Sequence, residues 1–492
     1  MFLHTPEGRR RTRRRLIIMC VVGVIAGVTA LGLGSASSAA AQINVACSPD
    51  PAGLIAAINS ANSAGGGTIN LAAGCHYLLT TPDNGENGLP AVTSRISLIG
   101  NGATIDGTGS VRILEVDGPG GNLSLQNITL TGGSADIGGA IANIGGTVSL
   151  NRSQVTGNAA TEAGGGIASA TFDPSSVAKL TLNNSSVSDN QQTDDSQDAL
   201  GGGGIVNILG IASLNQSHVN GNDAQGFVGG GIASGDYMNF SSTSSVLTIN
   251  ASQVDGNTAP NAGGGGIQNL LGSATLNNSE VNDNTSLNGA GISSGSGGNA
   301  PPLVSHLTLN NTRVDGNTAI TVPTPGEGPP IAGGGIANGG DASLNNSEVN
   351  NNTASHASGG GIVNHGRMTL NNSEVNGNVA AGSGLVGSGG GIINAQGPPG
   401  TGDTILTLNN SQVNDNHAHG DGGGIANGVP FGGMGLPGGA VTLHNSQVTG
   451  NVAAHGGGIF NSGGSVTLSN TAVTGNTPDN CEPPGTIAGC SG

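Results

Sequence analysis

Apolar residues in this chain recur in a long unit and not with the short period of an amphipathic helix. Between residues 125 and 476 the unit occurs twelve times, and residues 369–378, TLNNSEVNGN, are typical of its first half. A polar residue, expected to point outward, precedes the Leu. Such alternation of polar and apolar residues with a period of two is typical of a half-buried strand. A Val five residues later and an Ile at the end of a GGGI segment add two more apolar positions. The pattern predicts short strands separated by tight turns.

A unit that repeats within one chain indicates a stack of equivalent coils. We predict an all-β fold, a single-stranded right-handed parallel β-helix of about twelve or more coils, each with three short strands. Leu, Val and Ile should then stack on their equivalents in the coils above and below. The shortest repeat is 25–26 residues, and longer copies carry inserts, for which a solenoid has room only at its turns. At about 4.8 Å per coil, twelve coils give a rod on the order of 60 Å.

Two polar positions also recur in the unit. We number positions from the Leu, which is position zero. Position seven is Gly in seven regular copies, Asp in three (Asp189, Asp283, Asp415) and Asn in one (Asn351), so it predicts a left-handed corner. Position eight is Asn in eleven copies, which we interpret as a structural ladder that bonds turn backbone and stacks along the axis. The ladder residues are Asn158, Asn190, Asn222, Asn257, Asn284, Asn317, Asn352, Asn378, Asn416, Asn451 and Asn476. The Gly run before Ile predicts a corner without room for a Cβ, because a nucleotide loop would need a Lys and a following helix.

The N-terminal segment is expected to direct export. Residues 1–41 contain six Arg, an apolar run over 16–33 and a small-residue site, Ala39-Ala40-Ala41, which together indicate a secretory signal peptide. A twin-arginine signal and a general secretion signal both fit the Arg-rich start. The run is also long enough to remain as a membrane anchor, although the small-residue site favours cleavage.

The rest of the chain divides into a rod with a cap at each end. Residues 42–94 form the predicted N-terminal cap, with a helix over 51–63 that begins at Asp50 and Pro51 and presents an apolar stripe. Strand-like segments at 67–72, 96–105 and 111–117 lead into β-helix repeats over 95–476, and 477–492 form the C-terminal cap.

Four cysteines remain after the predicted cleavage: Cys47, Cys75, Cys481 and Cys490. An even number in an exported chain favours disulfides. Three pairings are open, and sequence separation favours Cys47–Cys75 with Cys481–Cys490. A metal site is the weaker interpretation, because no CxxC pair or Cys/His cluster occurs.

The net negative charge of the chain limits the classes of molecule that it is expected to bind. The formal charge of −17 includes six Arg and Glu7 within residues 1–41, so the exported chain would carry −17 − 5 = −22. Six fixed positive charges in that chain argue against nucleic acid, anionic membranes and acidic polysaccharides. We expect no cofactor and no stable membrane span after cleavage; a neutral glycan or a surface protein is the expected partner.

The repeat resembles that of chlamydial polymorphic outer-membrane proteins, which is defined by GGAI and FxxN, within the pectin-lyase-like superfamily of right-handed parallel β-helices. Residues 138–141 read GGAI, and Val155 to Asn158 give VxxN in place of FxxN. The likeness covers most of residues 95–476 and implies the fold; members of that fold include adhesins, lyases and hydrolases. The chain departs from the resemblance in that no autotransporter barrel is expected after residue 476.

Three groups of residues are candidates for catalysis or metal binding. Asp255, Asp283 and Asp315 would serve a hydrolase, although left-handed corner positions explain them more simply. Asp194, Asp195 and Asp198 suit loose calcium binding or a solvated loop. His417, His419 and His455 precede consecutive GGGI segments, where zinc or exposed loop histidines are the alternatives.

These considerations favour a non-catalytic extracellular or cell-surface protein that serves in adhesion, surface display or glycan contact. The alternative is a polysaccharide lyase or glycoside hydrolase of the same fold. A third hypothesis is a stacked hydroxyl face that orders water or binds neutral glycan. Its residues are Thr181, Thr248, Thr275, Thr308, Thr369, Thr407, Thr442 and Thr467.

Overall fold

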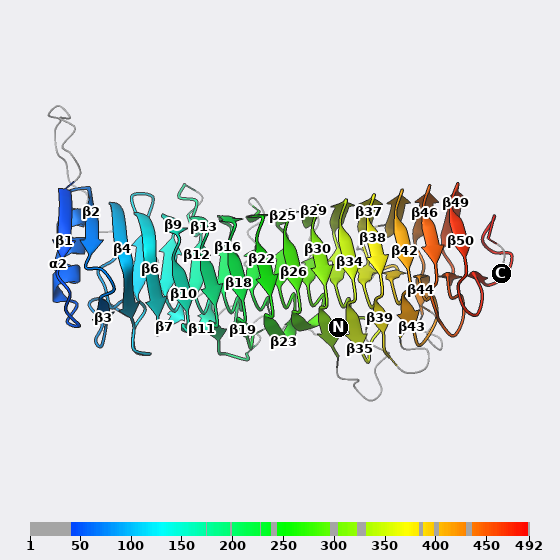
Figure 1. The fold of residues 1–492 in the computed structure, drawn as a ribbon, viewed down its shortest axis with the longest axis horizontal. Coiled ribbons are helices and arrows are strands. Elements are labelled where there is room, and N and C mark those ends of the chain that lie inside the picture. Colours follow the sequence, from blue (N-terminus) through cyan, green and yellow to red (C-terminus); the bar gives the residue numbers. More distant parts are fainter. Residues whose placement is uncertain are drawn as a thin grey trace, which may run out of the picture.

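The protein is a straight rod, a right-handed parallel β-helix with one helix at its N-terminal end (Figure 1). The computed structural model describes residues 41–490 apart from 174, 197–198, 227, 238–243, 296–303, 322–330, 383–386, 398–402 and 430–434. The predicted signal peptide lies outside the described residues, except for Ala41. Strands of successive coils pair in parallel along the whole rod, which confirms the predicted fold class.

The described part of each regular coil holds four short strands, which we name after the residue that each turns inward. The Leu strands are β1 (Ala41–Val45), β2 (Gly66–Leu71), β4 (Arg95–Asp106), β6 (Asn122–Thr131), β9 (Thr147–Asn151), β13 (Lys179–Asn183), β17 (Ile211–Asn215), β21 (Val246–Asn250), β25 (Ser273–Asn277), β29 (His306–Asn310), β33 (Asp341–Asn345), β37 (Arg367–Asn371), β41 (Ile405–Asn409), β46 (Ala440–His444) and β49 (Ser465–Ser469). The Val strands are β3 (His76–Leu78), β10 (Gln154–Thr156), β14 (Ser186–Ser188), β18 (His218–Asn220), β22 (Gln253–Asp255), β26 (Glu280–Asn282), β30 (Arg313–Asp315), β34 (Glu348–Asn350), β38 (Glu374–Asn376), β42 (Gln412–Asn414), β47 (Gln447–Thr449) and β50 (Ala472–Thr474).

Two further sheets complete the coil. The Ala strands are β7 (Ser134–Ile137), β11 (Ala159–Ala163), β15 (Gln191–Gln192), β19 (Asp223–Ala224), β23 (Thr258–Gly263), β27 (Thr285–Asn288), β31 (Thr318–Ile320), β35 (Thr353–Ser355), β39 (Val379–Ala380) and β43 (His417–Ala418). The Ile strands are β5 (Leu114–Asp117), β8 (Ile141–Ile144), β12 (Ile167–Ala170), β16 (Ile205–Ile208), β20 (Ile232–Gly235), β24 (Ile267–Leu270), β28 (Ile292–Gly295), β32 (Ile336–Gly339), β36 (Ile362–Asn364), β40 (Ile392–Asn394), β44 (Ile425–Val429), β48 (Ile459–Asn461) and β51 (Cys481–Glu482). The short strand β45 (Leu436–Pro437) pairs antiparallel with β44.

The apolar columns stack as predicted. Leu150 lies in register with Leu182 and Leu214, and Val155 begins a column of Val that ends at Val473. The Ile column is closed by a cysteine, because Cys481 occupies the rung after Ile459. The described positions of these columns are buried in one continuous core up to the last coil, where Leu468 is partly exposed.

The prediction of three strands per coil was wrong, because the Ala strands form a separate sheet. They are two to six residues long and mostly turn small residues such as Ala160 inward, with Gln192 at that position in one coil, so they carry little hydrophobic signal. The Leu and Val strands share one sheet that bends between them. The bend needs a left-handed residue two positions after the Leu, for example Asn372 with φ of 49°.

The predicted corner at position seven is left-handed in every regular copy, with φ of 55° at Asp189, Asp283 and Asn351 and 56° at Asp415. Backbone of this hand strains most residues, and Gly, Asn and Asp tolerate it best. Backbone geometry therefore favours Gly, Asn and Asp in this column, and a Cβ on Gly221 would in addition lie 2.9 Å from the Asp189 side chain of the coil before.

The N-terminal cap contains α2 (Ala52–Ser63), which begins one residue later than predicted. Asp50 still performs the predicted capping contact, because its Oδ1 accepts a hydrogen bond from the Ala52 N–H at 3.0 Å. The helix buries Leu54 and Ile58 against the first coil and closes the core at this end.

Both predicted disulfides are present, Cys47–Cys75 and Cys481–Cys490. The first joins the segment before α2 to the segment after β2. The second closes a loop that follows the last coil at the end opposite to α2 (Figure 1). Each disulfide thus lies at one end of the rod, where no further coil protects the core.

Candidate ligand-contact face and its polar ladders

The eleven Asn side chains at position eight form one continuous chain of hydrogen bonds inside the rod. Each Nδ2 donates to the Oδ1 of the Asn in the next coil at 2.9–3.0 Å, as Asn317 does to Asn352. The same Oδ1 accepts the backbone N–H of the previous Asn, and the Nδ2 also donates to a Val carbonyl of the preceding coil. Because these residues are buried, the ladder satisfies turn backbone that water does not reach.

This ladder explains the Gly before each Ile. A Cβ on Gly361 would lie 2.9 Å from the side-chain amide of Asn378, and the same contact occurs at Gly391 with Asn416. The GGGI segment and the VxxN segment are therefore two halves of one packing contact. Packing thus accounts for both segments.

A second Asn ladder, which the sequence analysis missed, lies on the outer side of the Leu strands. Here each amide donates toward the N-terminal end, from Asn183 to Asn151 at 3.0 Å and onward to Asn409, which donates to Asn371. The inner ladder donates toward the C-terminal end, so the two rows of amide dipoles run in opposite directions. The signal was present in the sequence as the Asn that directly follows the inward Leu or Ile in nine successive coils, from Asn151 to Asn409.

Beside the outer ladder runs a column of Ser and Thr hydroxyls, two residues earlier on each Leu strand. Thr181, Thr248, Thr275, Thr308, Thr369, Thr407, Thr442 and Thr467 all belong to this column, with Ser in the remaining coils. Most are half-buried, because each is flanked by the same strand of the neighbouring coils. We call the two columns together the hydroxyl–amide face.

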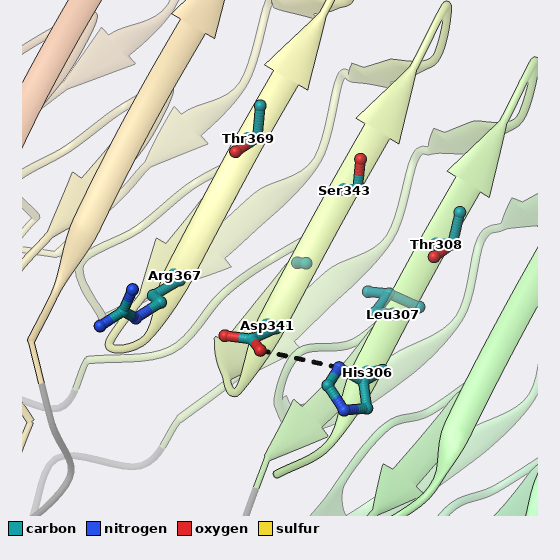
Figure 2. A pocket seen from close by; sticks show the side chains of 8 residues that line it. His306, Leu307, Thr308, Asp341, Ser343, Arg367 and Thr369 are labelled. Carbon is teal, nitrogen blue, oxygen red and sulfur yellow. Dashed lines mark ion pairs between the residues drawn. The ribbon is translucent and has the colours of Figure 1, made fainter.

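A shallow hollow lies beside the hydroxyl–amide face where three charged residues flank it. His306, Asp341 and Arg367 begin β29, β33 and β37 in adjacent coils and line a shallow hollow of about 300 Å³ with Thr308 and Thr369. Figure 2 shows these side chains beside one another on three neighbouring strands. The His306 Nδ1 lies 3.7 Å from the Asp341 Oδ2, and all three charged side chains are about half exposed or more. Sequence reasoning missed this group, because its members share no local motif.

The hollow lies where the connection from Ile to Leu is shortest. Eight residues join Ile336 to Leu344 and Ile362 to Leu370, whereas the coils on either side use 17 and 16. The two short turns are made by stacked glycines, and a Cβ on Gly366 would overlap the backbone oxygen of Gly340.

The three aspartates weighed for catalysis do not form a facing pair. Only Asp283 is a left-handed corner residue; Asp255 and Asp315 lie on β22 and β30, which corrects the prediction for these two. They occupy alternate rungs of one column with Asn282 between them. Burial raises the pKa of the Asp255 carboxyl.

Asp315 is held by its own neighbours. Arg313 pairs with it at 3.0 Å and also lies 3.4 Å from Glu348, while Asn351 donates to its Oδ1. A carboxylate with these partners is a poor general base.

The other two groups are also dispersed. Asp194 accepts hydrogen bonds from Ser196 within its own loop, and Asp198 lies outside the described residues. His417 and His419 pack ring against ring, whereas His455 bonds to the buried Asp421 at 2.8 Å. Among the residues that the structure describes, no three His, Cys, Asp or Glu side chains are placed to hold a metal ion.

Comparison with known proteins does not extend this description. No family model, no curated protein and no solved structure matches the chain. Within the described ranges, no helix is long and apolar enough to cross a membrane.

Proposed function

We propose that this protein is a non-catalytic extracellular or cell-surface rod that holds a neutral glycan on its hydroxyl–amide face. The observation that carries the proposal is the pair of columns, Ser or Thr beside Asn, which runs without a break from β9 to β41. Each ladder Asn uses one N–H and one lone pair along the axis, and an amide has two of each, so donors and acceptors are left for a ligand.

The face is rigid before any ligand arrives. Its side chains are held by their neighbours in adjacent coils, which reduces the entropy cost of binding. Aromatic residues are 2% of the chain, so few rings are available to stack on a sugar, and each coil alone would bind weakly. Repetition along the rod raises the overall affinity through multivalency.

The hollow supports a hydroxyl-bearing ligand in particular. Asp341 supplies acceptors and Arg367 supplies donors within one rung of each other, and the hydroxyls of Thr308 and Thr369 supply both. The paired signs leave the hollow without a large net charge, which suits a neutral ligand better than a polyanion.

Family membership is part of the same proposal. We infer a place among pectin-lyase-like β-helices with a repeat like that of chlamydial polymorphic outer-membrane proteins. GGAI at 138–141 and the VxxN segments support this inference, because their Gly and Asn columns make the packing contact described above. An adhesive or display role accords with export by the predicted signal peptide.

The test is binding of the purified exported protein to a glycan array and to insoluble neutral polysaccharides. The variant Thr308→Val/Thr369→Val keeps side-chain shape and removes two hydroxyls; we expect about tenfold weaker binding, equivalent to about 1.4 kcal/mol. The matched control is Thr156→Val, on the outer side of a Val strand, which should bind as the wild type does. Equal loss in both variants, or no retention of any neutral glycan, would refute the proposal.

A further inference from the structure

The two ends of the rod are closed to different extents. At the N-terminal end α2 lays Leu54 and Ile58 on the core, and both are at most 1% exposed. At the C-terminal end the cap places Cys481 on the Ile column of the last coil and adds Ile487 to the core, and the two are 3% and 2% exposed. This cap does not reach equally over the whole last coil.

The last Leu strand, β49, stays partly open. Its inward residues Val466 and Leu468 are partly exposed, although their equivalents one coil earlier, Val441 and Leu443, are buried. An interior column thus ends at the surface of the protein.

The backbone edge of β49 is open as well. Among the described strands β49 pairs only with β46, where the Ser465 N–H donates to Gly439 and the Ser469 carbonyl accepts from Asn445. Alternate residues of a parallel strand bond to opposite neighbours, so the N–H and C=O groups of Val466 and Leu468 point to the open edge.

The distribution of charge along the chain indicates that a second copy of the protein can cover the open edge of β49. The chain as a whole carries −17, yet residues 456–478 contain no charged side chain. Proteins usually protect an exposed edge strand with Lys, Pro or a bulge, and β49 has none of these. Residues 456–478 therefore add no repulsion between two copies at this end, where the nearest negative charges are those of Asp479 and Glu482 in the C-terminal cap.

We propose that two copies of the protein join end to end by antiparallel pairing of β49 about a two-fold axis. An axis at Thr467 pairs the outward N–H and C=O groups of Val466 and Leu468 and brings the two open Leu columns together. At the N-terminal end α2 lies over the core, and a two-fold contact uses the same strand of both copies, so the assembly closes as a dimer. The contact involves one coil from each copy and lies at the small end of specific interfaces, so the dimer forms at high protein concentration.

The register of the proposed β49 pairing predicts which charged substitutions prevent the dimer. With the axis at Thr467, Ser465 stands opposite the partner's Ser469, and both side chains are exposed on the outer surface. Ser465→Lys/Ser469→Lys places like charges opposite one another, whereas Ser465→Lys/Ser469→Glu places opposite charges there. The core residues of β49 are unchanged in both variants, so folding is preserved.

The experiment is sedimentation velocity of the purified exported protein over a wide concentration range. We expect a monomer–dimer equilibrium for the wild type, a monomer for the Lys/Lys variant and a restored dimer for the Lys/Glu variant. The control Gln154→Lys/Ser273→Lys adds the same charge in mid-rod and should dimerise as the wild type does.

Three results would overturn the proposal. The first is a wild type that stays monomeric throughout, and the second is a dimer that persists in the Lys/Lys variant. The third is growth beyond the dimer with rising concentration, which would mean head-to-tail contacts.

Discussion

The side-chain amide of Asn317 donates to Asn352 at 2.9 Å, and the same Asn352 oxygen also accepts the backbone N–H of Asn317 at 2.9 Å. Asn317 in turn accepts both corresponding bonds from Asn284. One side chain thus joins three coils, so the coils depend on one another through this column as well as through the apolar core.

Replacement of this residue should therefore cost stability. Asn317→Ala removes these bonds and leaves the buried Val281 carbonyl without its side-chain partner, so we expect a loss of about 1–3 kcal/mol in the free energy of unfolding. Chemical denaturation measures the change. Asn59→Ala, on the exposed side of α2, serves as the control and should change stability by less than about 0.5 kcal/mol. An unchanged midpoint for Asn317→Ala would show that the ladder contributes nothing to stability.

The apolar columns could be predicted because a buried position that stacks on its equivalents keeps the same type of apolar residue in each copy. Leu, Val and Ile recur in the same order in every regular copy, and Leu182, Val187 and Ile205 are all buried. The Asn at position eight was recognisable for the same reason, since a surface position would not require it in eleven copies. The periodicity of the sequence was thus enough to predict the fold.

The missed features leave a weaker trace in the sequence. The Ala strands include β15, which is Gln191–Gln192, so neither apolar pattern nor β propensity marks them. The left-handed bend after the Leu strands is occupied by Asn in most coils but by Arg152, Gln216 and Ala251 in three others, which hides the column. The hollow depends on register between His306 and Asp341, which only the stacked coils reveal.

Export can be tested on the terminal residues. We predict that the secreted protein begins at or near Gln42 and contains no free thiol, because the signal is cleaved and the four remaining cysteines are paired. Mass spectrometry of the secreted form, with and without alkylation, measures both properties. A chain that retains residues 1–41 would favour the membrane anchor.

Stability near the C-terminal end should depend on pH through His455. The hydrogen bond to Asp421, together with the charges of Asp421, Glu482 and Asp479, raises the pKa of the His455 imidazole above its usual value near 6.5. Because the pKa in the folded state is the higher one, the stabilisation is complete below about pH 6.5 and is lost as pH rises through the folded pKa.

The measurement is an NMR titration of His455 combined with thermal unfolding across this pH range. His455→Gln should remove the decline in stability, while His444→Gln, on the outer side of β46, should keep it. Since the His455 side chain is 56% exposed, solvent screening makes the effect small. A His455 that titrates at or below the usual value would contradict the prediction.

The last prediction is that the exported protein neither cleaves pectate nor hydrolyses polygalacturonate, with or without calcium. A glycosidase needs two carboxyl groups that face one substrate bond, and Asp255 and Asp315 lie two rungs apart. Two rungs correspond to about 9.6 Å between backbones, the upper limit for an inverting pair.

The space between them is occupied by Asn282, and Arg313 engages Asp315. A lyase would also need several cations near the uronate, and six fixed ones along the whole exported chain are too few. Release of reducing ends and of unsaturated products from acidic and neutral polysaccharides measures both activities. Sustained turnover that disappears on changing Asp255, Asp283 or Asp315 would place an active site on the Val strands. Binding without turnover would leave the hydroxyl–amide face as the functional surface.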